Sequence, residues 1–360
     1  MAIGFKQLKE WIDKPRKIKL AEKIFFVQQL KVMIQAGISL SVALKTLADQ
    51  TTSKSFKRVL IDLQLRVEKG NLLSQGLEAN QKLFGELFIN MIKAGEASGK
   101  LEDVLGQLFI QMKKDHDIIS KVRGAMIYPC IVVTLMIVIG IVVIVYVIPT
   151  ISSVFLELNV KLPLATRILI GTSNIAIKFG IYIVIGLVIA LAAFFRVVKT
   201  PTGKIKFHQL LLKLPIAGGI LKKINIARFC RTLSSLLKTD IPIVQSFEIT
   251  SKILGNVVYR NALLEAKEKI KKGINIQQAL QPYSNIFPPV VLQMISVGEE
   301  TGALDNILEE SASFYEEDVS QTMENLPSLI EPILMVILGC GVGGMAVAVM
   351  MPLYSLSQAI

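Results

Sequence analysis

The chain has 360 residues, of which 52% are hydrophobic and 19% charged, and its Lys and Arg exceed its Asp and Glu by 12. With a mean hydropathy of +0.54, this composition excludes a disordered chain and favours a membrane protein over a soluble enzyme. The three cysteines have no CxxC spacing, which excludes a four-cysteine zinc site and a disulfide framework.

The first 23 residues mix apolar side chains, such as Phe5, Leu8 and Trp11, with many Lys and Arg residues. We predict a basic amphipathic segment over residues 1–23 that lies on anionic lipid or docks a partner, a solvated tail being the alternative. The first long apolar run starts only after Arg123, so we expect no signal peptide and a cytoplasmic N-terminus.

Residues 24–125 show the periodicity of helices and no comparable strand pattern. From Leu101 to Met112, apolar side chains recur at intervals of three and four, which places them on one helix face. Gly37 and Gly99 interrupt the pattern as helix ends do. Short connections favour antiparallel neighbours, so we predict a bundle of about six helices.

Three apolar runs are long enough to be transmembrane helices: residues 126–149, 168–195 and 330–353. A helix of about 20 apolar residues crosses the roughly 30 Å hydrocarbon core of a bilayer. Lys178 interrupts the second run. We interpret it as a snorkelling side chain, with an intramembrane functional group as the alternative.

The first and third runs each carry a proline at the expected membrane edge. We expect the last helix of each bundle to continue into its span, with a kink at Pro129 and at Pro332. The residues before these prolines are Tyr128 and Glu331. An ionisable Glu at this depth is a functional candidate, although an interface residue is the simpler interpretation.

Basic residues predict the orientation of the spans. Four Lys or Arg residues closely precede the first span and four closely follow the second, whereas the short loop 150–167 contains only two. Because basic flanks stay cytoplasmic, residues 24–125 and 196–329 are expected inside. The loop and the tail 354–360 are then expected outside.

The sequence matches itself without a gap from Phe26 to Pro149 when shifted by 203 residues. The repeated unit is a bundle plus the membrane helix that follows it, and residues 196–329 form a linker and the second bundle. The predicted fold class is thus all-α, with two duplicated cytoplasmic bundles and three transmembrane helices. Matched pairs include Leu30 with Leu233, Lys69 with Lys272, Met91 with Met294 and Pro149 with Pro352.

A Gly-Glu-x-x-Gly motif precedes the last helix of each bundle. We interpret it as a turn whose second glycine ends one helix and whose first glycine allows close helix approach, with direct partner contact as the alternative. A nucleotide-binding loop is excluded, since the spacing is one residue short and no Ser or Thr follows the Gly-Lys pair. The residues are Gly95, Glu96 and Gly99 in the first copy and Gly298, Glu299 and Gly302 in the second.

The second bundle is acidic where the first is mixed, because no Lys or Arg follows Lys272. We hypothesise that Glu316, Glu317 and Asp318 engage a basic partner surface. The alternative is that this acidic helix pairs with the basic stretch 196–231 of its own bundle.

The third apolar run is rich in small residues. Gly339 with Gly343, and Gly344 with Ala348, form pairs that let two helices approach closely. Packing against the protein's own spans and association of two copies both fit this pattern.

Taken together, the Gly-Glu-x-x-Gly segments, the Tyr-Pro and Glu-Pro pairs at the membrane edge, and the stretch from Ala227 to Leu233 resemble a known family. It comprises the inner-membrane platform proteins of type IV pili and type II secretion systems, including secretion protein F. The resemblance covers nearly the whole chain after Lys23. One departure is Asp240, which stands where the family pattern has the glycine that Gly37 supplies, so we expect an altered turn.

The resemblance implies a non-catalytic scaffold without a cofactor, in the bacterial inner membrane and with its C-terminus external. Such a protein would couple a cytoplasmic assembly ATPase to the extraction of pilin or pseudopilin subunits and to filament assembly. Other inner-membrane machine components and a second copy of the chain are the further implied partners, and no nucleic acid is expected.

Two other functional classes compete with the scaffold. A secondary transporter built from repeats predicts polar clusters and broken helices near the membrane midplane, whereas these spans offer only isolated Lys178 and Glu331. An enzyme has less support, since the only histidines are His116 and His208 and no nucleophile or metal-ligand spacing occurs.

Overall fold

A computed structural model of the protein describes residues 18–150, 153 and 164–357, and all the elements in these ranges are helices. The predicted all-α class is therefore confirmed. Most of the expected N-terminal segment and of the expected external loop, and the last three residues, lie outside the described part. The chain divides into two compact units: Met1–Ile119 with His208–Val319, and Ser120–Phe207 with Ser320–Ile360.

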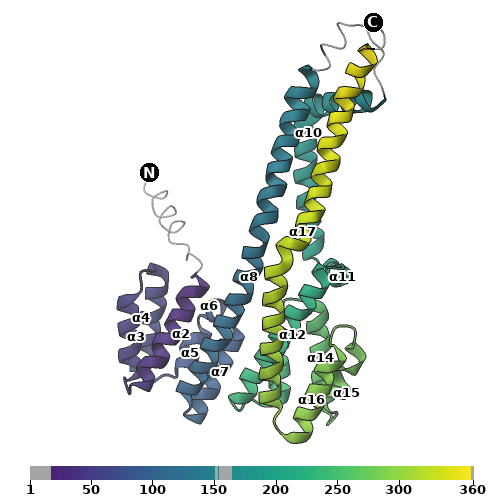
Figure 1. The fold of residues 1–360 in the computed structure, drawn as a ribbon. Helices are drawn as coiled ribbons and strands as arrows, with labels where there is room; N and C mark the ends of the chain where they lie inside the picture. The colour runs from purple at the N-terminus through teal and green to yellow at the C-terminus, as the bar shows by residue number, and fades with distance from the viewer. Residues whose placement is uncertain (1–17, 151–152, 154–163, 358–360) are drawn as a thin grey trace, which may run out of the picture. The chain divides into compact units, whose positions relative to one another are not determined.

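The first unit contains both bundles. The first bundle is coloured purple to blue in Figure 1, and its successive short helices pack against their neighbours in the chain. Its elements are α2 (Leu20–Gln35), α3 (Leu40–Gln50), α4 (Lys54–Glu68), α5 (Leu73–Glu78), α6 (Gln81–Phe84), α7 (Glu86–Ser98) and the start of α8 (Leu101–Val142).

The second bundle repeats this order after α11 (Pro201–Lys213). Shifting α3 and α7 by 203 residues gives the bounds of α13 and α16, so the duplication extends to where helices begin and end. The elements are α12 (Ala217–Lys238), α13 (Ile243–Ile253), α14 (Val257–Ile270), α15 (Ile276–Leu280), the 3-10 helix η2 (Gln281–Tyr283), α16 (Pro289–Thr301) and the start of α17 (Leu304–Ser357).

Local chemistry explains several helix boundaries. Ser53 Oγ accepts a hydrogen bond from Phe56 N at 3.4 Å at the start of α4, and Asn256 Oδ1 accepts one from Val258 N at 2.9 Å at the start of α14. These side chains satisfy amides of the first helical turn that have no partner within the helix.

The turn at Asp240 was expected to differ from the one at Gly37, and that expectation is wrong. Asp240 has a φ of 59° and Gly37 a φ of 77°, so both residues are left-handed. Aspartate tolerates this region better than most residues with a side chain. The connection between α12 and α13 therefore keeps the form of the connection between α2 and α3.

Each bundle has its own aromatic core. In the first, Phe26 packs edge-to-face on Phe56 with ring centres 5.5 Å apart, and in the second Phe229 packs on Phe287 at 5.1 Å. All four rings are nearly or fully buried. Burial of one such side chain contributes about 1.5–3 kcal/mol, so each aromatic cluster stabilises its own bundle.

The second unit holds the apolar parts of three long helices. By length and composition, segments of α8, of α10 (Leu164–Lys199) and of α17 can each cross a membrane. Pro129 lies inside α8, and α17 also runs through Pro332. As expected, the last helix of each bundle therefore continues into the apolar segment, and the kinks at these two prolines stay predictions.

Polar contacts join the long helices within the second unit. Ser173 of α10 donates a hydrogen bond to the carbonyl oxygen of Ile144 in the π-helical turn η1 (Val143–Val147). At the other end of the unit, Lys121 Nζ lies 3.6 Å from Glu324 Oε1. The remaining apolar surface faces outward, as it does in helices that contact lipid.

Candidate functional site

The glutamates of the Gly-Glu-x-x-Gly motifs cap short helices inside their own bundles. Glu96 accepts hydrogen bonds from the backbone N–H groups of Leu73 and Ser74, the latter at 3.0 Å. Glu299 accepts the equivalent bonds from Ile276 at 2.7 Å and Gln277 at 3.2 Å. These amides lie in the first turns of α5 and α15 and have no partner within the helix. Each carboxylate therefore holds the start of the short helix against the end of α7 or α16.

The motif glycines are where the backbone requires them. Gly99 and Gly302 end α7 and α16 with a φ of 70° each. A Cβ on Gly95 would lie 2.8 Å from Val104 Cγ2, and one on Gly298 would lie 2.9 Å from Leu304 Cα. The geometry thus accounts for the whole motif as an interhelix turn.

A charged cluster lies where α8, α12 and α17 meet. The guanidinium of Arg231 donates two hydrogen bonds to Glu316, at 2.7 and 2.9 Å, and a third to Ser313 Oγ at 2.9 Å. Lys114 of α8 places its Nζ 3.1 Å from Glu316 Oε2. Glu316 therefore receives one cation from each bundle, and the pair with Arg231 is almost fully removed from water.

A second group of polar contacts joins the bundles beside this cluster. Gln111 of α8 is buried, and its side-chain amide lies 3.3 Å from Thr232 Oγ1 and 3.5 Å from Ser235 Oγ of α12. Arg228 Nε donates to Asp115 Oδ1 at 3.0 Å. Burial raises the pKa of the Asp115 carboxyl, and the positive charge of Arg228 opposes this rise.

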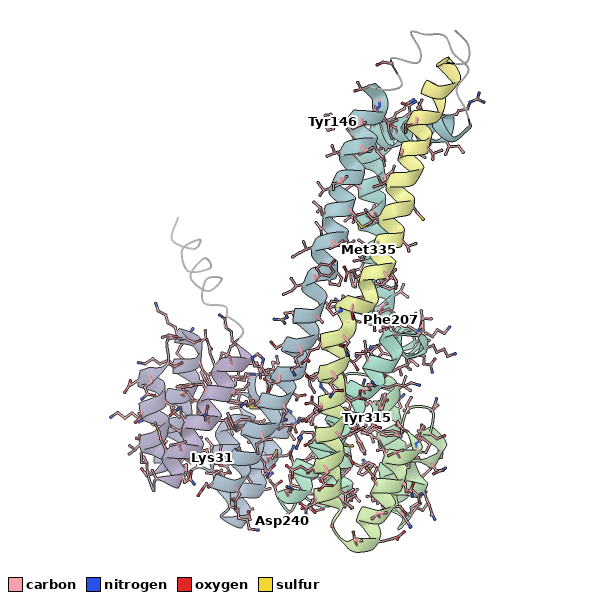
Figure 2. The ribbon with its side chains drawn as sticks, in the orientation of Figure 1. Lys31, Tyr146, Phe207, Asp240, Tyr315 and Met335 are labelled. Carbon is pink, nitrogen blue, oxygen red and sulfur yellow. The ribbon has the colours of Figure 1, made fainter. Side chains whose placement is uncertain are left out.

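Exposed ion pairs extend the junction at its edges. Lys100 Nζ lies 2.9 Å from Asp240 Oδ2, which is labelled in Figure 2, and Lys252 Nζ lies 3.0 Å from Glu86 Oε2. In water such pairs contribute little stability. These pairs show which surfaces of the two bundles face each other, since each pair joins a residue of one bundle to a residue of the other.

The three residues of the proposed partner surface on α17, Glu316, Glu317 and Asp318, have different environments. Glu316 is buried, so it does not belong to a surface. Asp318 Oδ1 lies 2.7 Å from Lys223 Nζ of α12, and Glu317 is exposed. For Glu316 and Asp318 the structure supports the alternative in which the acidic helix pairs with the basic stretch of its own bundle.

Sequence reasoning missed Gln111, Asp115 and Arg228 as a group. Each is an ordinary polar residue on an amphipathic helix, and the residues that meet are 113 to 124 positions apart in the sequence. The signal for two of them lies in the comparison of the copies, because a polar residue of one copy corresponds to an apolar residue of the other. Gln111 corresponds to Phe314, and Arg228 corresponds to Phe25.

Tyr128, Glu331, Pro332 and the glycines of the third span lie on the outside of the second unit, whereas Pro129 is buried. Tyr128 is 45% exposed, and Glu331 is exposed as well. A Cβ on Gly339, Gly343 or Gly344 would meet nothing within 4 Å, so these glycines are not packed against the described spans of their own chain. Ala348 follows them in α17, and Pro129 and Pro332 lie within α8 and α17.

Within the described ranges, no group of three or more His, Cys, Asp and Glu side chains could hold a metal ion. His208 uses its Nδ1 to accept a hydrogen bond from Val257 N at 3.0 Å. Cys230 is fully buried, and burial raises the pKa of its thiol to about 12. These two side chains are thus occupied with packing and backbone contacts.

The fold and the junction define a polytopic helical membrane protein built from a duplicated unit of bundle and span. The model of the family described as type II secretion system (T2SS), protein F, matches the chain twice, over residues 26–149 and 229–352. The chain belongs to this family. The two matched ranges also confirm the duplication and the family resemblance.

Individual relatives cover nearly the same length. Type IV pilus assembly protein PilC of Myxococcus xanthus is 34% identical over 94% of this chain and 81% of that protein. The PilC of Thermus thermophilus is 34% identical over 94% and 83%, respectively. Type II secretion system protein F of Pseudomonas aeruginosa is 28% identical over 92% of this chain and 82% of that protein.

Proposed function

We propose that this protein is the inner-membrane assembly platform of a type IV pilus or type II secretion machine. It couples a cytoplasmic assembly ATPase to the extraction of pilin or pseudopilin subunits from the membrane and to filament assembly. It performs no chemistry itself, associates with further copies of itself, and works alongside other inner-membrane components of the machine.

The observation that carries this proposal is the junction of the two bundles. Residues of α8 and α17 meet in the buried cluster around Arg231 and Glu316, and both helices run on without a break into apolar segments. A displacement imposed on either bundle can therefore pass along a continuous helix towards a span. This suits a protein that transmits force and has no need of a reactive group.

The proposed topology places both bundles in the cytoplasm, the loop 150–167 outside, and the C-terminus outside. Basic residues flanking the first two spans support it, and three spans put the two ends of the chain on opposite sides. A periplasmic phosphatase fused after Ile360 should be active, whereas a fluorescent protein that folds only in the cytosol should stay dark at that position. A cytosolic C-terminus would overturn the topology.

Co-purification from the native membrane tests the function. Cells that carry a tagged chain should yield the assembly ATPase and pilin-like subunits, and a chromosomal deletion should abolish surface filaments or secretion of the machine's substrates. The chain carrying Lys57→Ala, which alters an exposed pair with Asp49 far from the junction, should restore assembly. Substrate-dependent transport by the purified chain would favour the transporter instead.

A further inference from the structure

The surface of the first bundle between α7 and α8 is covered by the second bundle. Leu236, Ile241 and Ile249, from α12, α13 and the turn between them, belong to the buried core cluster of the first bundle. Underneath them Met91 and Gln111 are 0% and 1% exposed. This groove is thus filled from within the same chain.

The equivalent groove of the second bundle, between α16 and α17, is open. Met294 and Phe314 occupy the positions of Met91 and Gln111, and they are 40% and 66% exposed. Val290 and Val297 line the same hollow with Met294, and its volume is about 380 Å³. An exposed cluster of large apolar side chains outside the spans is typical of a protein interface.

The face that would fill this groove lies on α2 and α3 of the first bundle, which are purple in Figure 1, and it is also exposed. In the second bundle Ser235 and Ile241 cover the α7–α8 groove and are buried, whereas their counterparts Val32 and Ile38 are 52% and 38% exposed. Phe25, at the position of Arg228, is 53% exposed. Each chain therefore exposes one groove and one face that are equivalent to the groove and the face already in contact within the chain.

The unpaired surfaces suit each other chemically. Within the chain, Gln111 contacts Ser235 through polar atoms. At the corresponding positions both residues are apolar, Phe314 in the groove and Val32 on the face. The charges are complementary as well, since Glu310 lines the hollow and residues 289–319 hold no Lys or Arg, whereas residues 18–50 hold four Lys and two acids.

We propose that a second copy of this chain inserts its α2–α3 face into the α16–α17 groove, which repeats between chains the contact that joins the bundles within one chain. Such a contact is heterologous, so chains associate head to tail, into a ring if the rotation closes and into an open array if it does not. The inference rests on the self-association in the proposed function and names the surface that mediates it.

Cysteine cross-linking between two differently tagged chains tests this contact. Both chains carry Cys130→Ala and Cys340→Ala, and the buried, inert Cys230 stays. One chain carries Val32→Cys and the other Phe314→Cys, because these positions correspond to Ser235 and Gln111. A single chain carrying Gln111→Cys and Ser235→Cys is the matched control, and its internal disulfide should form in the folded protein.

Mild oxidation in native membranes should link the Val32→Cys chain to the Phe314→Cys chain, and neither variant should link to itself. A cross-link between two Val32→Cys chains would indicate a two-fold contact and overturn the proposal. Native mass spectrometry separates the remaining outcomes. Oligomers without the mixed cross-link refute this surface alone, whereas a monomer at all concentrations also refutes the proposed self-association.

A charge placed in the groove gives an independent readout. Met294→Glu should raise the dissociation constant of the oligomer at least tenfold. It places a charge in an apolar groove, and Glu310 already lines that groove. Leu65→Glu is the control, since Leu65 is 49% exposed on α4, away from both surfaces, and it should leave the oligomer unchanged. Equal effects of the two substitutions would contradict the proposal.

Discussion

Arg231 and Glu316 form a two-bond ion pair, at 2.7 and 2.9 Å, in which the two side chains are only 6% and 7% exposed. Both charges are almost fully removed from bulk water, so each depends mainly on the other for stabilisation. Lys114 adds a cation from the first bundle. The pair therefore couples the internal packing of the second bundle to its contact with the first.

Removing one partner should be far more harmful than removing both. We expect Arg231→Met to lower the free energy of unfolding by about 3–5 kcal/mol, because it leaves the Glu316 carboxylate buried without its main partner. Adding Glu316→Leu to this variant should recover most of the loss. Thermal unfolding in lipid nanodiscs measures both effects, and equal melting temperatures for the single and double variants would contradict the account.

The two motif glutamates should contribute similarly to stability. Glu96→Ala and Glu299→Ala each remove the acceptor for two amides that open a short helix, and each should cost about 1–2 kcal/mol. Hydrogen exchange should accelerate at the amides of Ser74 and Gln277, respectively. Glu300→Ala changes the exposed neighbouring residue and should leave these amides protected.

Replacing the first glycine of a motif with alanine should lower the stability of the protein. Gly298→Ala brings a Cβ within 2.9 Å of a backbone atom, Leu304 Cα, and we expect it to cost about 1–3 kcal/mol. Gly219→Ala in α12 is the control, since a Cβ there meets nothing within 4 Å. That change should be neutral or stabilising by up to about 1 kcal/mol. Melting temperatures of the two variants decide the matter.

Cys230 should not react with thiol reagents while the protein is folded. Its side chain is fully buried, and a thiol pKa of about 12 leaves almost no thiolate at pH 8. In a variant without Cys130 and Cys340, maleimide labelling should therefore appear only after denaturation. Rapid labelling of the native protein would show that the second core opens readily.

Much of the fold could be predicted because it is encoded in local and repeated patterns. The apolar runs, the amphipathic stripe after Leu101 and the offset of 203 residues each depend on residues close in sequence or on direct comparison of the copies. The left-handed glycines at the motif turns belong to the same category.

The junction between the bundles could not be predicted in this way. The burial of Glu316 depends on Arg231 and Lys114, which come from two other helices, and the acidic run around it resembles an exposed face. The prediction of an altered turn at Asp240 was wrong for a related reason. The left-handed backbone there accommodates an aspartate, and the side chain of this aspartate pairs with Lys100 from the other bundle.

The buried charges give the two halves of this protein different identities. Arg231 corresponds to exposed Gln28 in the first copy, and Glu316 corresponds to exposed Lys113. A chimera with two first halves would retain both aromatic cores and both turns, yet it would lack the buried Arg231–Glu316 pair of the second half, to which Lys114 of the first half binds. Divergence after the duplication has thus given the second half a contact that a copy of the first half could not make.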